Sequence, residues 1–203
     1  MAKKKQISAN SDSEVVESAP QLPDFPIFEG LDQLLTIAQG KIFTSYEPFE
    51  GLHTGSLSMD WALGNGRGVP RGQFTMFVGP EKSGKTTLAM LIGINTVAEG
   101  GKVVVFNLEG RWNVEYAYKS GMGYPGKDYM LIKPDTQEDT FTYMVYFAEK
   151  GYDLCIVDSV TAMSPRSEFE EAEVEGGFKT VQARNWSTFF RMRMNKISAS
   201  RTA

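Results

Sequence analysis

The stretch that decides the fold is QFTMFVGPEKSGKTTL, which runs from Gln73 to Leu88. Its first residues are an apolar run that predicts a strand over 74–78, and the apolar residues from Leu88 onward predict a helix. Between them, Gly79 to Thr86 match the pattern G-x-x-x-x-G-K-[ST]. A strand, a glycine-rich turn and a helix in this order are typical of a phosphate-binding loop.

Each residue type in this loop has a chemical reason to be there. Glycines let backbone N–H groups face an anion, the Lys85 ammonium can reach the β and γ phosphates, and the Thr86 hydroxyl can bind Mg²⁺. The start of the following helix adds its positive dipole end to the same place. The sequence therefore predicts a site for ATP and Mg²⁺, in which the loop residues that bind the nucleotide are Gly79, Pro80, Glu81, Lys82, Ser83, Gly84, Lys85, Thr86 and Thr87.

Length and composition limit what surrounds the loop. A chain of 203 residues suits a single α/β domain with a sizeable core. The net charge of −4 gives no global attraction for nucleic acid, so such binding needs a local basic patch. The single cysteine, Cys155, excludes an internal disulfide and lies in an apolar run, which favours packing. With no apolar run of about 18 residues and no signal-peptide core, we expect a cytoplasmic protein without a membrane partner.

Apolar runs alternate with helical patterns along the chain. Strands are expected over 102–108, 129–133 and 154–157, and helices over 57–63, 85–99, 113–120 and 136–150. This alternation predicts an α/β fold with a mostly parallel, doubly wound sheet. Residues 1–24 read as a polar tail, residues 25–50 as a helical arm and residues 51–203 as the core. The helix expected over 31–38 in the arm is either part of the core or a contact with a neighbouring subunit.

Acidic residues follow two of the expected strands. Glu109 follows the strand over 102–108, and Asp158 follows the strand over 154–157, so both should face the nucleotide at the carboxyl edge of the sheet. Asp158 is predicted to support Mg²⁺. Many NTPases carry a catalytic glutamate directly after this aspartate, where this chain has Ser159. Glu109 is therefore the candidate base that activates water, and the alternative is a solvated loop acid.

The end of the chain is basic. An acidic run, formed by Glu168, Glu170, Glu171, Glu173 and Glu175, is followed by a stretch with no acidic residue up to Ala203. That stretch holds Lys179, Arg184, Arg191, Arg193, Lys196 and Arg201, which could neutralise several phosphates of a nucleic acid. The same residues lie on an amphipathic helix expected over 181–197, so a core helix with a solvated basic face explains the pattern equally well.

Several segments together resemble the RecA family of recombinases, in its bacterial and phage branch. They are HTGSLSMDWALGNGRGVPRG, GPEKSGKTT, NLEG, NVEYA, LIKPDT and LCIVDSVTAMSPRSEFE, in matching order and spacing over about 51–193. The resemblance implies a RecA-type P-loop NTPase in which Glu109 is the catalytic base, assisted by Lys85, and Thr86 and Asp158 support Mg²⁺. It also implies that the Tyr116 ring packs on adenine, beside Asn113, where the family usually has an aspartate.

The resemblance further implies a DNA-dependent ATPase that forms filaments on single-stranded DNA in recombination and repair. In the family, the stretch that matches Glu171 to Lys179 is the first DNA-facing loop, and the positions of Arg184 and Arg191 hold the backbone of single-stranded DNA. Alternatives are a RecA-type helicase motor and a non-hydrolysing nucleotide-binding module that joins recombinase filaments. The family also has a further strand between the phosphate-loop strand and the Asp158 strand. This sequence stops before it, so we expect a partial core with an incomplete sheet that a second chain completes.

Overall fold

The computed structural model describes residues 50–170 and 178–203. The tail expected over 1–24, residues 25–49 of the arm expected over 25–50, and the acidic residues Glu171, Glu173 and Glu175 lie outside this part. Within it, no helix is both long and apolar enough to cross a membrane.

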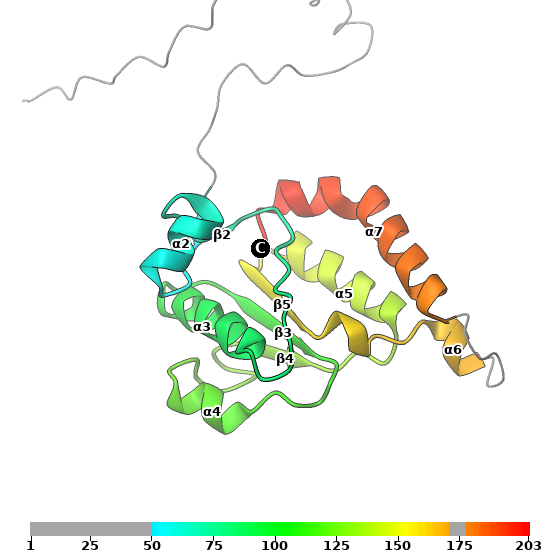
Figure 1. Cartoon of the computed structure of the whole chain (residues 1–203), viewed down its shortest axis with the longest axis horizontal. Coiled ribbons are helices and arrows are strands. Elements are labelled where there is room, and N and C mark those ends of the chain that lie inside the picture. The colour runs from blue at the N-terminus through cyan, green and yellow to red at the C-terminus, as the bar shows by residue number, and fades with distance from the viewer. Residues whose placement is uncertain (1–49, 171–177) are drawn as a thin grey trace, which may run out of the picture. The chain divides into compact units, whose positions relative to one another are not determined.

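A parallel sheet with the strand order β4–β3–β5 forms the centre of the fold (Figure 1). Its strands are β3 (Val103–Asn107), β4 (Met130–Ile132) and β5 (Leu154–Asp158). The central strand β3 pairs with β4 from Val104↔Met130 and with β5 from Val103↔Leu154. The three strands lie where the sequence predicted them, and their order brings the carboxyl ends of β3 and β5 side by side.

Five helices precede, connect or follow these strands, in the places where the sequence predicted helices. They are α2 (Leu57–Gly64), α3 (Lys85–Ala98), α4 (Val114–Lys119), α5 (Gln137–Glu149) and α7 (Phe178–Ser200). The 3₁₀ helix η2 (Val160–Ala162) and the short α6 (Arg166–Glu170) were not predicted. A small antiparallel pair, β1 (Gly51–Leu52) and β2 (Val69–Pro70), brackets α2.

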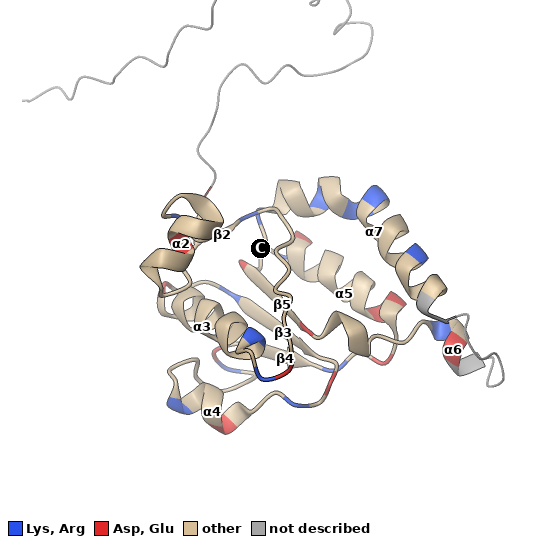
Figure 2. Ribbon diagram, viewed as in Figure 1, with Lys and Arg blue, Asp and Glu red and all other residues tan. Residues whose placement is uncertain are grey.

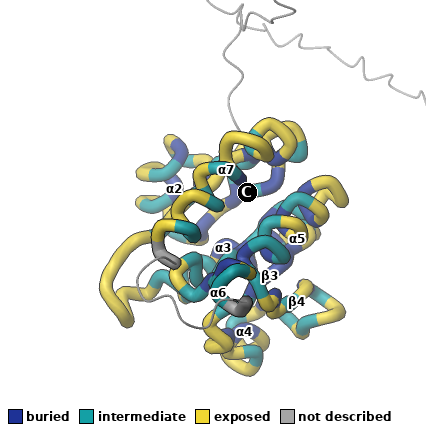
Figure 3. Tube along the Cα trace, turned by 90° about the vertical axis from the view of Figure 1, so that its right-hand side faces the viewer, coloured by how far each residue is buried: buried dark blue, intermediate teal, exposed yellow. Residues whose placement is uncertain are grey.

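Both faces of the sheet are covered by helices. On one face, Val103 and Val105 of β3 pack with Met90 and Ile92 of α3. On the other face, the alternate residues Val104 and Phe106 pack with side chains of α5 and α7, among them Met144, Phe147, Phe189 and Ile197. The strand β3 is buried between α3 and α5 (Figure 3). This arrangement confirms the α/β fold with a parallel, doubly wound sheet, and it explains why β3 is apolar from Val103 to Phe106.

The strand predicted over 74–78 is absent from the sheet, so that prediction was wrong. Residues 73–79 form a coil between β2 and α3 (Figure 1), and the side chains of Met76 and Val78 are 74% and 81% exposed. An apolar run becomes a strand only when a neighbouring backbone pairs with it. In the described part of the chain, no strand lies beside these residues to do so.

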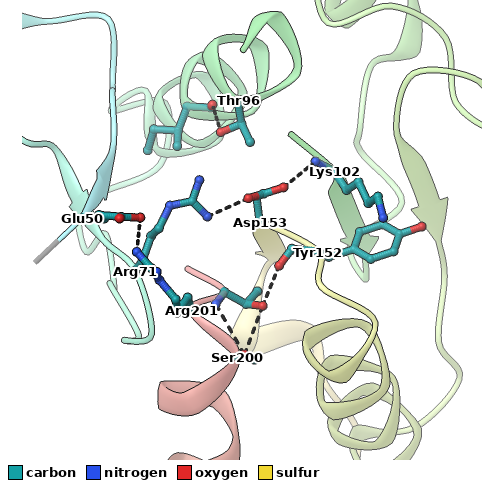
Figure 4. A network of polar contacts seen from close by, with 10 residues as sticks. Glu50, Arg71, Thr96, Lys102, Tyr152, Asp153, Ser200 and Arg201 are labelled. Atoms are coloured by element: carbon teal, nitrogen blue, oxygen red, sulfur yellow. Dashed lines mark hydrogen bonds and ion pairs between the residues drawn. The ribbon is translucent and has the colours of Figure 1, made fainter. Parts of the chain in front are cut away.

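A polar network fastens the end of α7 to the start of β5 (Figure 4). Arg71 forms an ion pair with Asp153, with 2.7 Å between Nη1 and Oδ1, and the other Asp153 oxygen accepts from the Lys102 N–H at 2.8 Å. The Thr202 hydroxyl donates to the Tyr152 carbonyl at 2.6 Å. Gly72 passes so close to α7 that a Cβ there would lie 2.8 Å from the Ser198 carbonyl oxygen. The network fixes where the last residues lie relative to the sheet.

Asp60 ties α2 to the turn that precedes it. Its carboxylate is 6% exposed, accepts from the N–H and hydroxyl of Thr54 at 2.8 and 2.6 Å, and lies 3.2 Å from Nδ1 of His53. Burial alone raises the pKa of Asp60, but the hydrogen bonds from Thr54 and His53 outweigh it and hold the pKa below its ordinary value of 3.8. The ionised form of Asp60 is therefore the one that stabilises the fold.

The hydrogen bonds of Asp60 predict how the stability of the fold depends on pH. An aspartate whose pKa is lower in the folded state stabilises the fold above its unfolded pKa, and that stabilisation is lost as the pH falls through the folded pKa. We expect Asp60→Asn to lower the free energy of unfolding by about 1–3 kcal/mol at pH 7, because hydrogen bonds to a buried charge are lost. The difference between Asp60→Asn and the unchanged chain, measured by urea unfolding, should shrink below about pH 4.

Candidate nucleotide-binding site

The phosphate loop occupies residues 79–84 and leads directly into α3. Gly84, the residue that caps the helix, has φ = +90°, a left-handed conformation that favours glycine. The Leu88 N–H donates to the Gly84 carbonyl at 2.8 Å, which begins the helical hydrogen bonds. The N–H groups of the first turn therefore remain available at the loop, where a helix N-terminus attracts anions.

The Lys85 side chain folds back over this loop. Its ammonium donates to the carbonyl oxygens of Gly79 at 2.9 Å and Pro80 at 2.7 Å. The cation thus lies inside the turn and at the start of α3. This is the place where the phosphates of a nucleotide would meet both the helix N-terminus and a positive charge.

Thr86 and Asp158 bring oxygen atoms together beside the loop. The Thr86 hydroxyl donates to Oδ2 of Asp158 at 3.1 Å, although the residues lie far apart in the sequence. Partial burial raises the pKa of Asp158, the charge of Glu109 raises it further, and the Thr86 hydrogen bond and Lys85 oppose the rise.

A hydroxyl and a carboxylate are the oxygen ligands that Mg²⁺ uses when substrate phosphates and water supply the others. The residues present therefore fit Mg²⁺. The described residues contain no cluster of three or more His, Cys, Asp or Glu side chains that could hold a metal alone.

Glu109 lies next to this pair, at the carboxyl end of β3. Its N–H donates to the Asp158 carbonyl at 3.2 Å, which fixes the loop after β3 against the end of β5. The Ser159 hydroxyl donates to Oε1 of Glu109, and the Ser159 and Thr161 hydroxyl oxygens are 2.8 Å apart. The Glu109 carboxylate is 31% exposed and therefore accessible to water.

The sequence did not reveal the role of Ser159 and Thr161. Ser159 stood out only because it replaces a glutamate, and nothing in the spacing pointed to Thr161. Their hydroxyls meet because η2 begins directly after Ser159 and turns the backbone back on itself. Together they orient the Glu109 carboxylate, whose other oxygen, Oε2, is 3.9 Å from Nη1 of Arg111.

The residues expected near adenine lie on α4. The Asn113 side chain caps that helix by accepting from the Tyr116 N–H at 2.8 Å. The Tyr116 ring is 49% exposed and so presents a free aromatic face. Among residues 50–170 and 178–203, no hydrogen bond or ion pair joins either side chain to Lys85 or Glu109. Their place at adenine stays a prediction.

The basic residues expected to bind DNA lie on α7. Arg184 and Arg191 are exposed and seven residues apart in the sequence, so they share one helix face, and neither has an ion-pair partner among the described residues. Figure 2 shows Lys and Arg residues at several places along α7. Lys196 pairs with Glu149 at 2.6 Å, and Arg201 pairs with Glu50. Lys179 belongs to the first turn of α7, and its side chain lies outside the described part.

The chain is similar to known proteins of one family. Residues 37–203 match the model of the RecA N-terminal domain. The chain is 36% identical over 159 residues to protein RecA of Streptomyces ambofaciens, which covers 78% of this chain and 42% of that protein. It is 35% identical over 142 residues to protein RecA of Ehrlichia chaffeensis, which covers 70% of this chain and 38% of that protein.

Among solved structures, a RadB recombinase is similar with a TM-score of 0.52 and 25% identity, covering 74% of this chain and 66% of that one. The matched region thus spans about two fifths of the length of the RecA relatives. Because the family model covers most of the sequence, the chain belongs to the RecA family of recombinases.

Proposed function

We propose that this chain is the ATP-dependent core of a recombinase that binds single-stranded DNA, forms filaments on it and acts in homologous recombination and repair in the cytoplasm. The observation that carries the proposal is the meeting of Lys85, Thr86, Asp158 and Glu109 at the carboxyl ends of β3 and β5. A cation, a metal-binding pair and an accessible carboxylate are the parts that phosphoryl transfer to water needs.

In this proposal each side chain of the site has its own role in ATP hydrolysis. Lys85 exchanges its carbonyl partners for the β and γ phosphates, and the N-terminus of α3 stabilises the charge that develops there. Glu109, oriented by the Ser159 hydroxyl, takes the proton of the attacking water. Mg²⁺ bound by Thr86 and Asp158 would neutralise phosphate charge. Tyr116, with Asn113 at its side, supports adenine by stacking.

The exposed face of α7 supports the proposal of DNA binding. Arg184 and Arg191 are exposed and give each subunit a short basic row on one face of α7. Lys179, in the first turn of α7, is proposed to contact the same DNA. Such residues contact mainly phosphate, so little sequence preference is expected. Filament formation would repeat the row along the strand.

The proposal is tested by ATP turnover. Purified chain is mixed with ATP and Mg²⁺, and phosphate release is followed with and without single-stranded DNA. DNA-stimulated release that Lys85→Ala abolishes would support the recombinase core. ATP binding with turnover no faster than Lys85→Ala would instead favour the non-hydrolysing module.

A separate prediction concerns Arg191. Replacing it with alanine should weaken binding to single-stranded DNA for all sequences alike and lower the slope of log affinity against log salt by about 1, because one phosphate contact is lost. Fluorescence anisotropy with a labelled oligonucleotide over a salt series measures this slope.

Arg193→Ala is the matched control, since it removes the same charge from the same helix. By helix geometry Arg193 points to a different side of α7 than Arg191, toward α5, and its charge lowers the pKa of Glu149 after the larger effects of Lys196. Equal losses for the two variants would contradict a DNA-binding row at Arg184 and Arg191.

A further inference from the structure

The turn that contains η2 carries the hydroxyl groups that contact Glu109. Each hydroxyl has a single proton to donate. Because the Ser159 hydroxyl donates its proton to Glu109, the Thr161 hydroxyl donates to the Ser159 oxygen, which lies 2.8 Å away. The orientation of the Glu109 carboxylate therefore depends on where this turn places the backbone of Ser159 and Thr161.

The backbone of η2 stabilises this turn only weakly. A 3₁₀ helix of three residues makes few hydrogen bonds, and their geometry is poorer than in an α-helix. The Met163 N–H donates to the Val160 carbonyl at a long 3.4 Å, and no backbone N–H among the described residues donates to the Met163 carbonyl. Met163 is 4% exposed, so a carbonyl without a partner there would destabilise the turn. The turn thus needs a partner from another part of the chain.

Gln182 of α7 supplies this partner. Its side-chain nitrogen donates to the Val160 carbonyl at 3.0 Å and to the Met163 carbonyl at 2.9 Å. These two bonds use both protons of the amide, and they hold η2 at its first residue and directly after its last. The backbone of Gln182 is held in turn, because its carbonyl accepts from Nε2 of Gln137, a residue of α5 that is 0% exposed. The contact between α5 and α7 therefore fixes the amide that holds η2.

The two sides of α7 have different contacts. Gln182 lies on the side that meets η2 and α5. Arg184 comes two residues later, which places it about 200° further around the helix axis, and it is exposed. The helix that carries the proposed DNA-binding row on one side thus holds the turn behind Glu109 with the other side.

We propose that Gln182 is a positioning residue for ATP hydrolysis. By holding η2, it keeps the Ser159 hydroxyl on Glu109 and so keeps that carboxylate oriented toward the attacking water. Among the described residues, Gln182 has no hydrogen bond with the phosphate loop, Thr86 or Asp158. It should therefore affect the rate of the chemical step and not the affinity for ATP. The inference rests on the proposed function, because it assigns Gln182 a role in the same reaction.

The experiment replaces Gln182 with methionine, which keeps the length of the side chain but has no proton to donate to the two carbonyls. Phosphate release by the full chain is measured over a range of ATP concentrations, with Mg²⁺ and saturating single-stranded DNA. We expect kcat to fall about 10–10²-fold and KM for ATP to change by less than about twofold, because a catalytic group is misplaced while the phosphate loop is intact. Amide hydrogen exchange at Ala162 and Met163, which requires no turnover, should become about tenfold faster.

Asn185→Leu is the matched control, because Asn185 lies about one turn further along the same side of α7. Its side-chain amide donates to Gln137 at 3.0 Å and to Glu138 at 3.1 Å, both at the start of α5. The change also removes two hydrogen bonds of a part-buried amide, so it should cost a similar amount of stability. Because η2 keeps its partner, kcat and exchange at η2 should stay within about twofold of the unchanged chain. Equal losses of kcat in Gln182→Met and Asn185→Leu would overturn the proposal.

A second variant keeps the test decisive if Gln182→Met does not fold. Ser159→Ala removes only the hydroxyl that Gln182 is proposed to place on Glu109, and it should lower kcat while KM stays the same. The double variant should be no slower than the slower single variant, because both changes act through one hydrogen bond. An unchanged kcat in either single variant, or losses that add in the double variant, would overturn the proposal.

Failure of the proposed function would look different. If Lys85→Ala released phosphate as fast as the unchanged chain, the proposed ATP hydrolysis would be contradicted, and with it the role of Gln182. If Lys85→Ala abolished phosphate release and Gln182→Met did not slow it, only the inference about Gln182 would be overturned.

Discussion

Glu109→Gln should still bind ATP but hydrolyse it about 10²–10⁴-fold more slowly, which is the usual contribution of a general base. Glutamine keeps the size of the side chain and can still accept the Ser159 hydrogen bond, but it cannot take a proton from water. Because Lys85 and the start of α3 are unchanged, affinity for a fluorescent ATP analogue should change little. Single-turnover phosphate release and equilibrium binding, measured on the same preparation, separate these two quantities.

Glu99→Gln is the control for this result. Glu99 follows the last turn of α3, at the end of that helix opposite to the phosphate loop, and its side chain is exposed. The substitution is chemically identical, and turnover should stay within about twofold of the unchanged chain. A Glu109→Gln variant that hydrolyses ATP as fast as Glu99→Gln would remove Glu109 from the mechanism and return it to the role of a solvated loop acid.

Phe106→Ala should destabilise the fold by about 3–5 kcal/mol, the cost of removing a large buried ring and leaving a cavity. Phe106 is 0% exposed, lies on the central strand and packs edge-on against Phe147 of α5, with 6.2 Å between ring centroids. A loss of this size is a large fraction of the stability of an ordinary domain. Urea unfolding followed by tryptophan fluorescence should show a clearly lower midpoint.

Leu57→Ala tests whether burial causes that loss. Leu57 is a large apolar residue in a helix, but its side chain is 74% exposed. Its replacement should change the free energy of unfolding by no more than about 0.5 kcal/mol. Comparable losses for Leu57→Ala and Phe106→Ala would mean that the core does not depend on packing between β3 and α5.

Sequence patterns predicted the strands and helices whose own apolar pattern matches the surface that they bury. The apolar run over 102–108 and the helical pattern over 136–150 appear as β3 and α5, because each pattern matches the surface that the element buries. Glu109 and Asp158 were predicted at strand ends on one edge, and the parallel order of β3 and β5 brings them together.

Features that depend on distant backbone were not predicted. The run over 74–78 has the composition of a strand, but its state depends on whether a neighbour pairs with it. Likewise, the Ser159 and Thr161 hydroxyls meet Glu109 only through the turn into η2. Asn113 was predicted near adenine, and its side-chain oxygen Oδ1 caps α4, a local role that its position before a helix could have suggested.

The hydrogen bonds from the Lys85 ammonium to backbone carbonyl oxygens affect the free energy of nucleotide binding. The Lys85 ammonium donates hydrogen bonds to the inward-facing carbonyl oxygens of Gly79 and Pro80 and so holds the turn in shape. An incoming triphosphate must compete with these two carbonyl oxygens for the Lys85 ammonium, which reduces the binding free energy that Lys85 contributes. Because the turn is already ordered, binding does not cost the entropy of ordering it. Loss of the ammonium should therefore loosen the empty loop as well as the loaded one.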